Sequence, residues 1–229
     1  MAGSVFVTGG TGYIGSRLIP LLVQRGHSVS AVVRSGSESR LPAGAKPFVA
    51  DPLRHGAYAQ AVNGHDTFVH LIGTPHPSPA KAKQFQEVDL VSIEVAVEAA
   101  RAAGVSHFIY LSVAQPAPMM QAFIEVRRRG EEMVRASGMN ATMVRPWYVL
   151  GPGHWWPYAI IPFYWICELL PATRESARRL GLVSLGQVLK TLVGAVENPP
   201  SGVRVLGVPE IRMTSPASAA PSPDRRGFG

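Results

Sequence analysis

A glycine-rich run near the amino terminus has the composition of a phosphate-binding loop. Gly9 allows a sharp turn, Gly12 lets the backbone approach a pyrophosphate, and Gly15 lets a helix pack closely against a sheet. An apolar strand pattern precedes the run and a helical pattern follows it, and the free N–H groups at a helix start attract phosphate. The pattern therefore predicts a dinucleotide site rather than a simple glycine turn. The whole run is Thr8, Gly9, Gly10, Thr11, Gly12, Tyr13, Ile14 and Gly15.

The residues after the next two predicted strands bear on which dinucleotide is bound. NAD-binding proteins usually carry an acid after the second strand, where it holds the ribose 2′-hydroxyl. Arg34 and Ser35 stand there in this sequence. An arginine pairs with a 2′-phosphate instead, and such a bond contributes about 1.5–3 kcal/mol. We therefore expect NADP, with NAD as the alternative and a solvated Arg34 as the competing interpretation. Asp51 either accepts a hydrogen bond from the adenine amino group or caps the turn at Pro52.

Short apolar runs alternate with longer helical patterns along most of the chain. Apolar runs of this kind are buried on both faces, as in parallel sheets, and their alternation with helices is typical of a doubly wound, mostly parallel α/β fold. The predicted strands are Val5–Thr8, Val29–Val33, Lys46–Ala50, Thr67–Ile72, His107–Leu111, Ala141–Val144 and Val203–Val208. The predicted helices are Tyr13–Arg25, Ala57–Val62, Ala82–Ala103, Met119–Ala136 and Leu185–Val196.

The domain organisation follows from the same pattern. We expect one Rossmann domain over residues 1–213, in which residues from about 147 to 213 contribute a small cap on the substrate side. Ser184 and Gln187 are spaced as a capping box at the start of the last predicted helix. Residues 214–229 are rich in Pro, Ser, Ala and Arg, and we expect them to be disordered.

Composition and charge limit the classes of partner. The 229 residues, 46% of them hydrophobic, suffice for a core without disulfides, and we expect no metal site. The lone Cys167 and an amino terminus unlike a signal peptide predict a cytoplasmic protein. The net charge of +7 suits an anionic partner. Because the arginines are scattered and no nucleic-acid module is recognisable, we expect no nucleic-acid partner. A dinucleotide phosphate or an acidic membrane surface fits the charge equally well.

Several short motifs follow one another along the chain: the glycine run, Asp51, Val69-His70-Leu71-Ile72-Gly73, Asp89, Tyr110-Leu111-Ser112 and Arg145-Pro146. Taken in order, they resemble the atypical short-chain dehydrogenase/reductase superfamily, and most of all its NmrA-like and complex I accessory-subunit-like branch. The resemblance covers roughly residues 4–212 and implies an NAD(P)-binding Rossmann fold. It also implies that Leu71, Ile72 and Gly73 lie along the cofactor and that Pro146–Val149 sits near the nicotinamide.

The catalytic half of this resemblance is incomplete. Active members of the superfamily use a Ser together with a Tyr-x-x-x-Lys motif, in which the Tyr protonates the carbonyl oxygen and the Lys binds the nicotinamide ribose. Ser112 matches the Ser, but Phe123 and Arg127 stand where Tyr and Lys are expected. Phenylalanine has no proton to give, and losing a general acid costs about 10²–10⁴ in rate. Arg127 retains the donors needed to hold the ribose hydroxyls.

Three interpretations of this site remain open. Another group donates the proton, with Tyr148 and His154 as candidates because they follow Arg145-Pro146; packing is the competing role for both. Alternatively, the acceptor is a quinone or flavin-like molecule that needs no positioned acid, or NADP is bound without turnover. We expect an NADP-dependent oxidoreductase acting on an apolar substrate, either quinone-like, lipidic or carbonyl. The alternative is a catalytically silent NADP-binding sensor or assembly subunit.

The segment Trp155–Leu170 is dense in aromatic residues and interrupted by prolines. It is too short to span a bilayer, which takes about 20 apolar residues. It predicts a lid that packs on the domain, an apolar pocket wall, or a surface that touches a membrane or another subunit. The arginines that follow, Arg174, Arg178 and Arg179, would suit a peripheral membrane anchor.

Overall fold

A computed structural model describes residues 2–152, 175–176 and 179–214. Its central feature is a seven-stranded sheet in which every neighbouring pair is parallel. The strand order is β3-β2-β1-β4-β5-β6-β9. The doubly wound parallel fold predicted from the sequence is therefore confirmed. The strands are β1 (Ser4–Thr8), β2 (Ser28–Val33), β3 (Ala45–Val49), β4 (Thr67–His70), β5 (His107–Leu111), β6 (Asn140–Val144) and β9 (Val203–Leu206).

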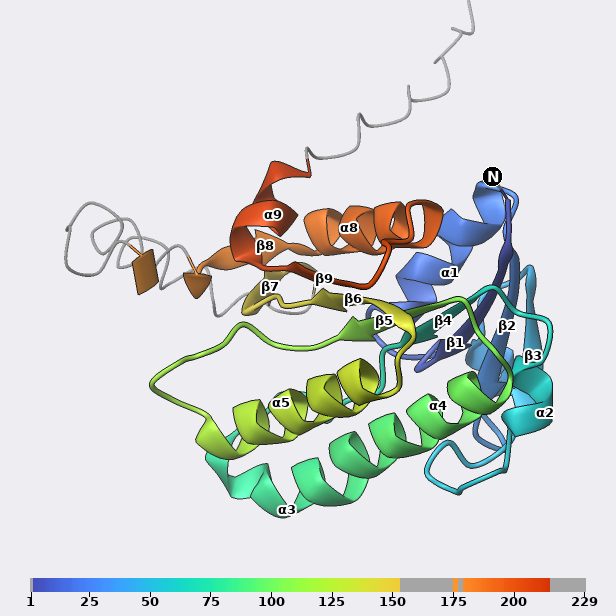
Figure 1. The fold of residues 1–229 in the computed structure, drawn as a ribbon, viewed down its shortest axis with the longest axis horizontal. Helices are drawn as coiled ribbons and strands as arrows, with labels where there is room; N and C mark the ends of the chain where they lie inside the picture. The colour runs from blue at the N-terminus through green and yellow to red at the C-terminus, as the bar shows by residue number, and fades with distance from the viewer. Residues whose placement is uncertain (1, 153–174, 177–178, 215–229) are drawn as a thin grey trace, which may run out of the picture.

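Helices cover both faces of the sheet (Figure 1). One face carries α1 (Gly15–Gln24), α8 (Leu185–Glu197) and α9 (Val208–Met213). The other face carries α2 (Ala59–Val62), α3 (Ala82–Gln84), α4 (Val91–Ala102) and α5 (Gln121–Ala136). The connections place the carboxyl ends of all seven strands at one edge of the sheet, which is where ligands bind in open α/β folds.

Each face of the sheet has its own apolar core. On the α1 and α8 face, aliphatic side chains such as Leu18, Leu22 and Leu192 are fully buried. On the α4 and α5 face the core includes several aromatic rings, and those of Phe68 and Phe108 stack with centroids 5.1 Å apart. Strand residues alternate between the two cores, so every central strand is buried on both sides, as its apolar sequence predicts.

The long helix predicted over Ala82–Ala103 is divided into three parts. A π-helical turn, Phe85–Leu90, lies between α3 and α4. Its buried side chains are Phe85 and Asp89. π-helical turns occur frequently at functional sites, and this one directs a carboxylate into the interior.

The carboxyl-terminal part differs from the cap expected over residues 147–213. β9 is the seventh strand of the main sheet and α8 packs on a face of that sheet, so both belong to the main domain and not to a separate cap. The capping box of α8 is present as predicted, because Ser184 Oγ accepts from the Gln187 N–H. A separate two-stranded sheet, β7 (Tyr148–Leu150) and β8 (Leu182–Ser184), was not predicted because three-residue strands have no readable periodicity. The sequence also misses α9, because the predicted strand continues to Val208.

Two expectations lie outside the described residues. They concern the aromatic segment Trp155–Leu170, together with His154, and the tail after Thr214. Among the described residues, no helix combines the length and the apolar character that crossing a membrane requires.

Candidate dinucleotide and catalytic site

The glycine run forms a tight loop between β1 and α1. Gly9 has a φ of 79°, which favours glycine, and a Cβ there would lie 2.9 Å from the Leu71 carbonyl carbon. A Cβ at Gly15 would lie 2.2 Å from the Gly9 carbonyl oxygen. The close approach at Gly15 is therefore to the loop itself, whereas the motif predicted contact with the sheet. Gly12 is exposed, and a Cβ there would approach only Gly9 within contact distance. The loop leaves its Gly12 side open.

The loop after β4 lies against this glycine loop. β1 and β4 are neighbours, although β2 and β3 intervene in the sequence, so the strand order reverses at this point. The Leu71 N–H donates to the Thr8 carbonyl at 3.1 Å and continues the pairing beyond β4. Dinucleotides bind where the strand order reverses. The structure thus brings Leu71 and Ile72 beside Gly9, and the role of Leu71, Ile72 and Gly73 along the cofactor stays a prediction.

Arg34 and Asp51 follow β2 and β3 at the same edge. Arg34 is exposed, and its side chain makes no hydrogen bond or ion pair with any described residue. Asp51 Oδ1 accepts from the Leu53 N–H at 2.9 Å, so the carboxylate caps the turn that contains the half-buried Pro52. The turn-capping role of Asp51 is therefore present, and its role toward adenine stays a prediction.

Ser112, Pro146 and Tyr148 gather beyond the carboxyl ends of β5 and β6. The Ser112 N–H donates to Val144 O at 2.8 Å and the Ala114 N–H donates to Pro146 O at 2.9 Å. Ser112 is 7% exposed, and its Oγ has no hydrogen-bond partner among the residues that the structure describes. Tyr148 opens β7 two residues after Pro146, and partial burial raises the pKa of its phenol. These three sequence-predicted residues thus occupy adjacent stretches of chain.

Phe123 and Arg127 lie one turn apart near the start of α5. The Phe123 ring packs on Phe85 with centroids 5.0 Å apart, and the Arg127 guanidinium lies 5.1 Å from the Phe123 ring centroid. Arg127 is buried, with Nη2 2.7 Å from Asp89 Oδ1 and Nη1 3.1 Å from Leu111 O. The guanidinium is therefore bonded to protein groups.

Gly73, which the resemblance places along the cofactor, lies against this arginine. A Cβ on Gly73 would lie 2.1 Å from Arg127 Nη2, so only glycine leaves room for the guanidinium. Arg127 thus lies directly behind the loop that the resemblance places along the cofactor. A direct bond from Arg127 to a ribose hydroxyl stays a prediction.

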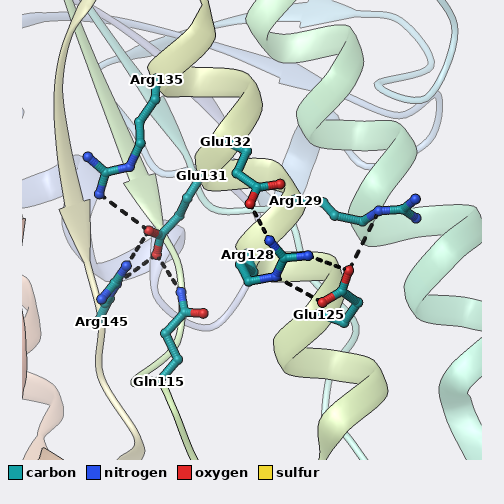
Figure 2. Close-up of polar contacts among 8 residues, drawn as sticks. All are labelled: Gln115, Glu125, Arg128, Arg129, Glu131, Glu132, Arg135 and Arg145. Atoms are coloured by element: carbon teal, nitrogen blue, oxygen red, sulfur yellow. Dashed lines mark hydrogen bonds and ion pairs between the residues drawn. The ribbon is translucent and has the colours of Figure 1, made fainter.

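A second buried ion pair on α5 was not predicted from the sequence. Figure 2 shows Glu131 surrounded by Arg145, Gln115 and Arg135. Glu131 is 3% exposed and accepts from Arg145 Nε at 2.8 Å and from Gln115 Nε2 at 3.0 Å. Because Arg145 precedes Pro146 and Gln115 follows Ala114, this carboxylate fastens both loops of the Ser112 site to α5. The available signal was the charge of Arg127 and Glu131 on an otherwise apolar helical stripe.

A pocket of about 590 Å³ opens at the same edge, beyond β5, β6 and β9. Its walls combine apolar and polar side chains, and it begins two residues after Ser112. The lining includes Ala114, Gln115, Arg145, Val205, Val208 and Pro209.

The strand order, which reverses between β1 and β4, and the glycine loop at the carboxyl end of β1 define a dinucleotide-binding Rossmann domain. A family model described as NAD(P)H-binding matches residues 9–152, which is more than half of the chain. The protein belongs to this NAD(P)H-binding family. The resemblance to atypical short-chain dehydrogenases/reductases is confirmed at this level.

Similar proteins include reductases. The chain is 27% identical over 211 residues to a ceramide reductase of Caulobacter vibrioides, covering 88% of this chain and 63% of the relative. It is 26% identical over 168 residues to the 4-hydroxy-2-methyl-3-oxo-4-farnesyl-3,4-dihydroquinoline-1-oxide ketoreductase of Stigmatella aurantiaca, covering 64% of this chain and 50% of the relative. The chain thus spans about half to two thirds of the length of these curated relatives.

Solved structures agree with the fold assignment. The Bordetella bronchiseptica enzyme WbmH, in complex with NAD+, superposes with a TM-score of 0.67 at 19% identity, over 92% of this chain and 79% of that one. At this identity the likeness establishes the fold.

Proposed function

We propose that this protein is an NADP(H)-dependent oxidoreductase that reduces a carbonyl or quinone-like group of an apolar substrate. The observation that carries the proposal is the Ser112 hydroxyl, which is buried at the strand ends without a partner among the described residues. An unpaired buried hydroxyl costs about 1–3 kcal/mol. A substrate oxygen bound at this place would satisfy it. Membership of the NAD(P)H-binding family and the reductase relatives support redox chemistry at the site.

The cofactor half of the proposal assigns a role to each loop. The pyrophosphate lies on the open side of Gly12, at the amino-terminal end of α1, where the helix dipole is positive. Arg34 pairs with the 2′-phosphate, Asp51 and Pro52 lie near the adenine, and Pro146 lies beside the nicotinamide. The remaining residues of Thr8–Gly15 and Leu71–Gly73 line the crevice. The reduced nicotinamide supplies the hydride when it is bound.

The proton has to come from a group other than Phe123. We assign it to Tyr148, because the Ser112–Ala114 segment runs beside the Val144–Pro146 segment that leads into Tyr148. Partial burial raises the pKa of Tyr148, so the phenol keeps its proton at neutral pH. Ser112 donates a hydrogen bond to the same substrate oxygen. Arg127 acts as a positioning residue through Gly73 and Asp89.

The substrate side is apolar near this oxygen. Phe123, Trp147 and Leu111 are half-buried there and pack against the core. The names of the two reductase relatives refer to a ceramide and to a farnesyl-bearing compound, both largely apolar. The 590 Å³ pocket beyond Ala114 has room for a further part of such a molecule.

The test begins with binding of NADPH and of NADH to the purified protein. NADPH absorbance is then followed in the presence of long-chain ketones, quinones and ring ketones. We expect tighter binding of NADPH and oxidation with at least one apolar acceptor. Binding without oxidation across the whole panel would reject the proposal.

A catalytically silent NADP-binding sensor or assembly subunit is the second candidate. The observation in its favour is Phe123, whose ring is packed between Phe85 and Arg127 and has no proton to donate. A single-turnover measurement separates the two, because a silent protein binds NADPH but leaves it reduced.

A further inference from the structure

A buried histidine connects the two loops of the cofactor crevice. His70 is the last residue of β4 and is 0% exposed. Its Nδ1 lies 2.8 Å from the hydroxyl of Thr8, which is the last residue of β1 and directly precedes Gly9. Its Nε2 lies 3.3 Å from the hydroxyl of Ser92 on α4. The ring therefore bridges the glycine loop and the helix behind it.

The direction of these hydrogen bonds is determined by Ser92. The Ser92 hydroxyl donates to the Asp89 carbonyl at 3.0 Å, and it has only one hydrogen to give. His70 Nε2 therefore carries the ring proton and donates to Ser92, while Nδ1 accepts from Thr8. Burial lowers the pKa of His70 to about 3, and the charge of Arg127 acts in the same direction. The ring is thus neutral at physiological pH, so Nδ1 carries no hydrogen and accepts from the Thr8 hydroxyl.

The chain of bonds continues to the second loop through Asp89. Its Oδ2 accepts from the Thr74 N–H at 2.9 Å and from the Thr74 hydroxyl at 2.5 Å. Its Oδ1 accepts from Arg127. Thr74 directly follows Gly73, so Asp89 holds the far end of the loop that follows β4. All of these side chains are at most 5% exposed.

We propose that His70 is a positioning residue for the cofactor: it sets the glycine loop, through Thr8, against the loop that Asp89 holds through Thr74. This proposal rests on dinucleotide binding, which family membership establishes for the domain. His70 itself does not touch the cofactor. Its effect is on the spacing of the two loops between which the cofactor lies.

A matched control exists in the neighbouring strand. His107 is 1% exposed and pairs through Nε2 with the Thr142 hydroxyl at 2.9 Å. It is the first residue of β5, so it lies at the opposite edge of the sheet from the cofactor crevice. Replacing either histidine removes one buried ring and its hydrogen bonds. Only His70 is connected to the glycine loop.

The experiment compares His70→Phe with His107→Phe, and Ser92→Ala with Thr142→Ala. NADPH affinity is measured by fluorescence titration well below the melting temperature, which is determined for each variant. We expect both His variants to melt earlier. We expect about tenfold weaker NADPH binding in His70→Phe and about threefold weaker binding in Ser92→Ala, since one hydrogen bond contributes roughly a factor of three to ten. The two control variants should bind like wild type.

Two results would overturn the proposal. One is unchanged NADPH affinity in both His70→Phe and Ser92→Ala. The other is an equal loss of affinity in each variant and its control, which would assign the effect to stability alone. If His70→Phe does not fold, the comparison of Ser92→Ala with Thr142→Ala decides. A wild-type protein that binds neither NADPH nor NADH would reject the dinucleotide site itself, a distinct result because no variant is then needed.

Discussion

At the scale of single residues, we propose that the choice between NADPH and NADH depends on Arg34. The side chain is exposed at the end of β2 and bonds to no described residue, so its donors are available to a 2′-phosphate. We expect Arg34→Ala to weaken NADPH binding about 10- to 100-fold, because a charge-assisted contact is lost, while NADH binding changes little. Arg101→Ala, an exposed arginine on α4, is the control. Equal effects on both cofactors would show that Arg34 does not read the 2′-phosphate.

The proton donor is a second question at this scale. If Tyr148 donates the proton, Tyr148→Phe lowers kcat by about 10²–10⁴ with NADPH affinity unchanged. Because burial raises the pKa of the phenol, the donor form persists to higher pH than in a free tyrosine, and kcat should stay level through the neutral range. Rate and cofactor titrations on the same preparations measure both quantities. If Tyr148→Phe turns over at the wild-type rate, Tyr148 is not the proton donor.

At the scale of elements, we expect two glycines of the same loop to differ in role: Gly12 is needed for cofactor binding and Gly15 for folding. A Cβ at Gly12 would meet only the Gly9 carbonyl, at 3.1 Å, whereas a Cβ at Gly15 would lie 2.2 Å from that same oxygen. We expect Gly12→Val to abolish binding of either cofactor with a melting temperature close to wild type. Gly15→Val should instead lower the melting temperature markedly. Retained cofactor affinity in Gly12→Val would place the phosphates elsewhere.

Helix α5 acts as a clamp on the three loops at the strand ends. Arg127 bonds to the carbonyls of Ile72 and Leu111, and Glu131, one turn later, bonds to Arg145 and Gln115. Between these two pairs the helix comes so close to β5 that a Cβ at Gly130 would lie 2.6 Å from the Tyr110 hydroxyl. The stretch of α5 from Arg127 to Glu131 therefore fastens these three loops to the helix.

The clamp predicts that replacing Glu131 lowers the free energy of unfolding much more than replacing its neighbour Glu132. Glu131→Gln removes a buried anion and leaves Arg145 partly buried without its counter-ion, so we expect a loss of about 2–4 kcal/mol of unfolding free energy. Glu132→Gln is the control, because its partner Arg128 lies with it on the exposed side of α5 (Figure 2), and its cost should stay below about 1 kcal/mol. Urea unfolding of both variants measures the difference. Equal losses would contradict the clamp.

At the scale of the whole molecule, the sequence predicts what depends on local pattern. The strand positions, the glycine loop and the capping box at Ser184 follow from periodicity and short motifs, and the structure has them. The pairings that fasten the site do not follow from such patterns. Asp89 and Arg127 are 38 residues apart, and the π-helical turn that directs Asp89 inward leaves no periodic signal. The bridge from Thr8 to His70 spans 62 residues and arises only because β1 and β4 become neighbours.

The same buried histidines predict how the stability of the whole domain depends on pH. Burial lowers the pKa of His70 to about 3 and that of His107 to about 4, from 6.5, with Arg127 and Arg204 adding to the respective shifts. Below pH 6.5 the unfolded chain binds protons at these positions and the folded protein does not, so stability is lost as the pH falls. The loss per pH unit rises from about 0.7 kcal/mol for each group at pH 6.5, where the unfolded histidine is half protonated, toward about 1.4 kcal/mol, so two such histidines remove about 3 kcal/mol between pH 6.5 and 5. Urea unfolding across this range measures the slope.

His107→Phe should reduce this slope by about half, because one of the two titrating groups is gone. The exposed His55, whose pKa is raised by its hydrogen bond to Glu98, shifts in the opposite sense and cannot produce this loss. A free energy of unfolding that stays constant from pH 6.5 to 5 would mean that these two rings are not held neutral in the folded state.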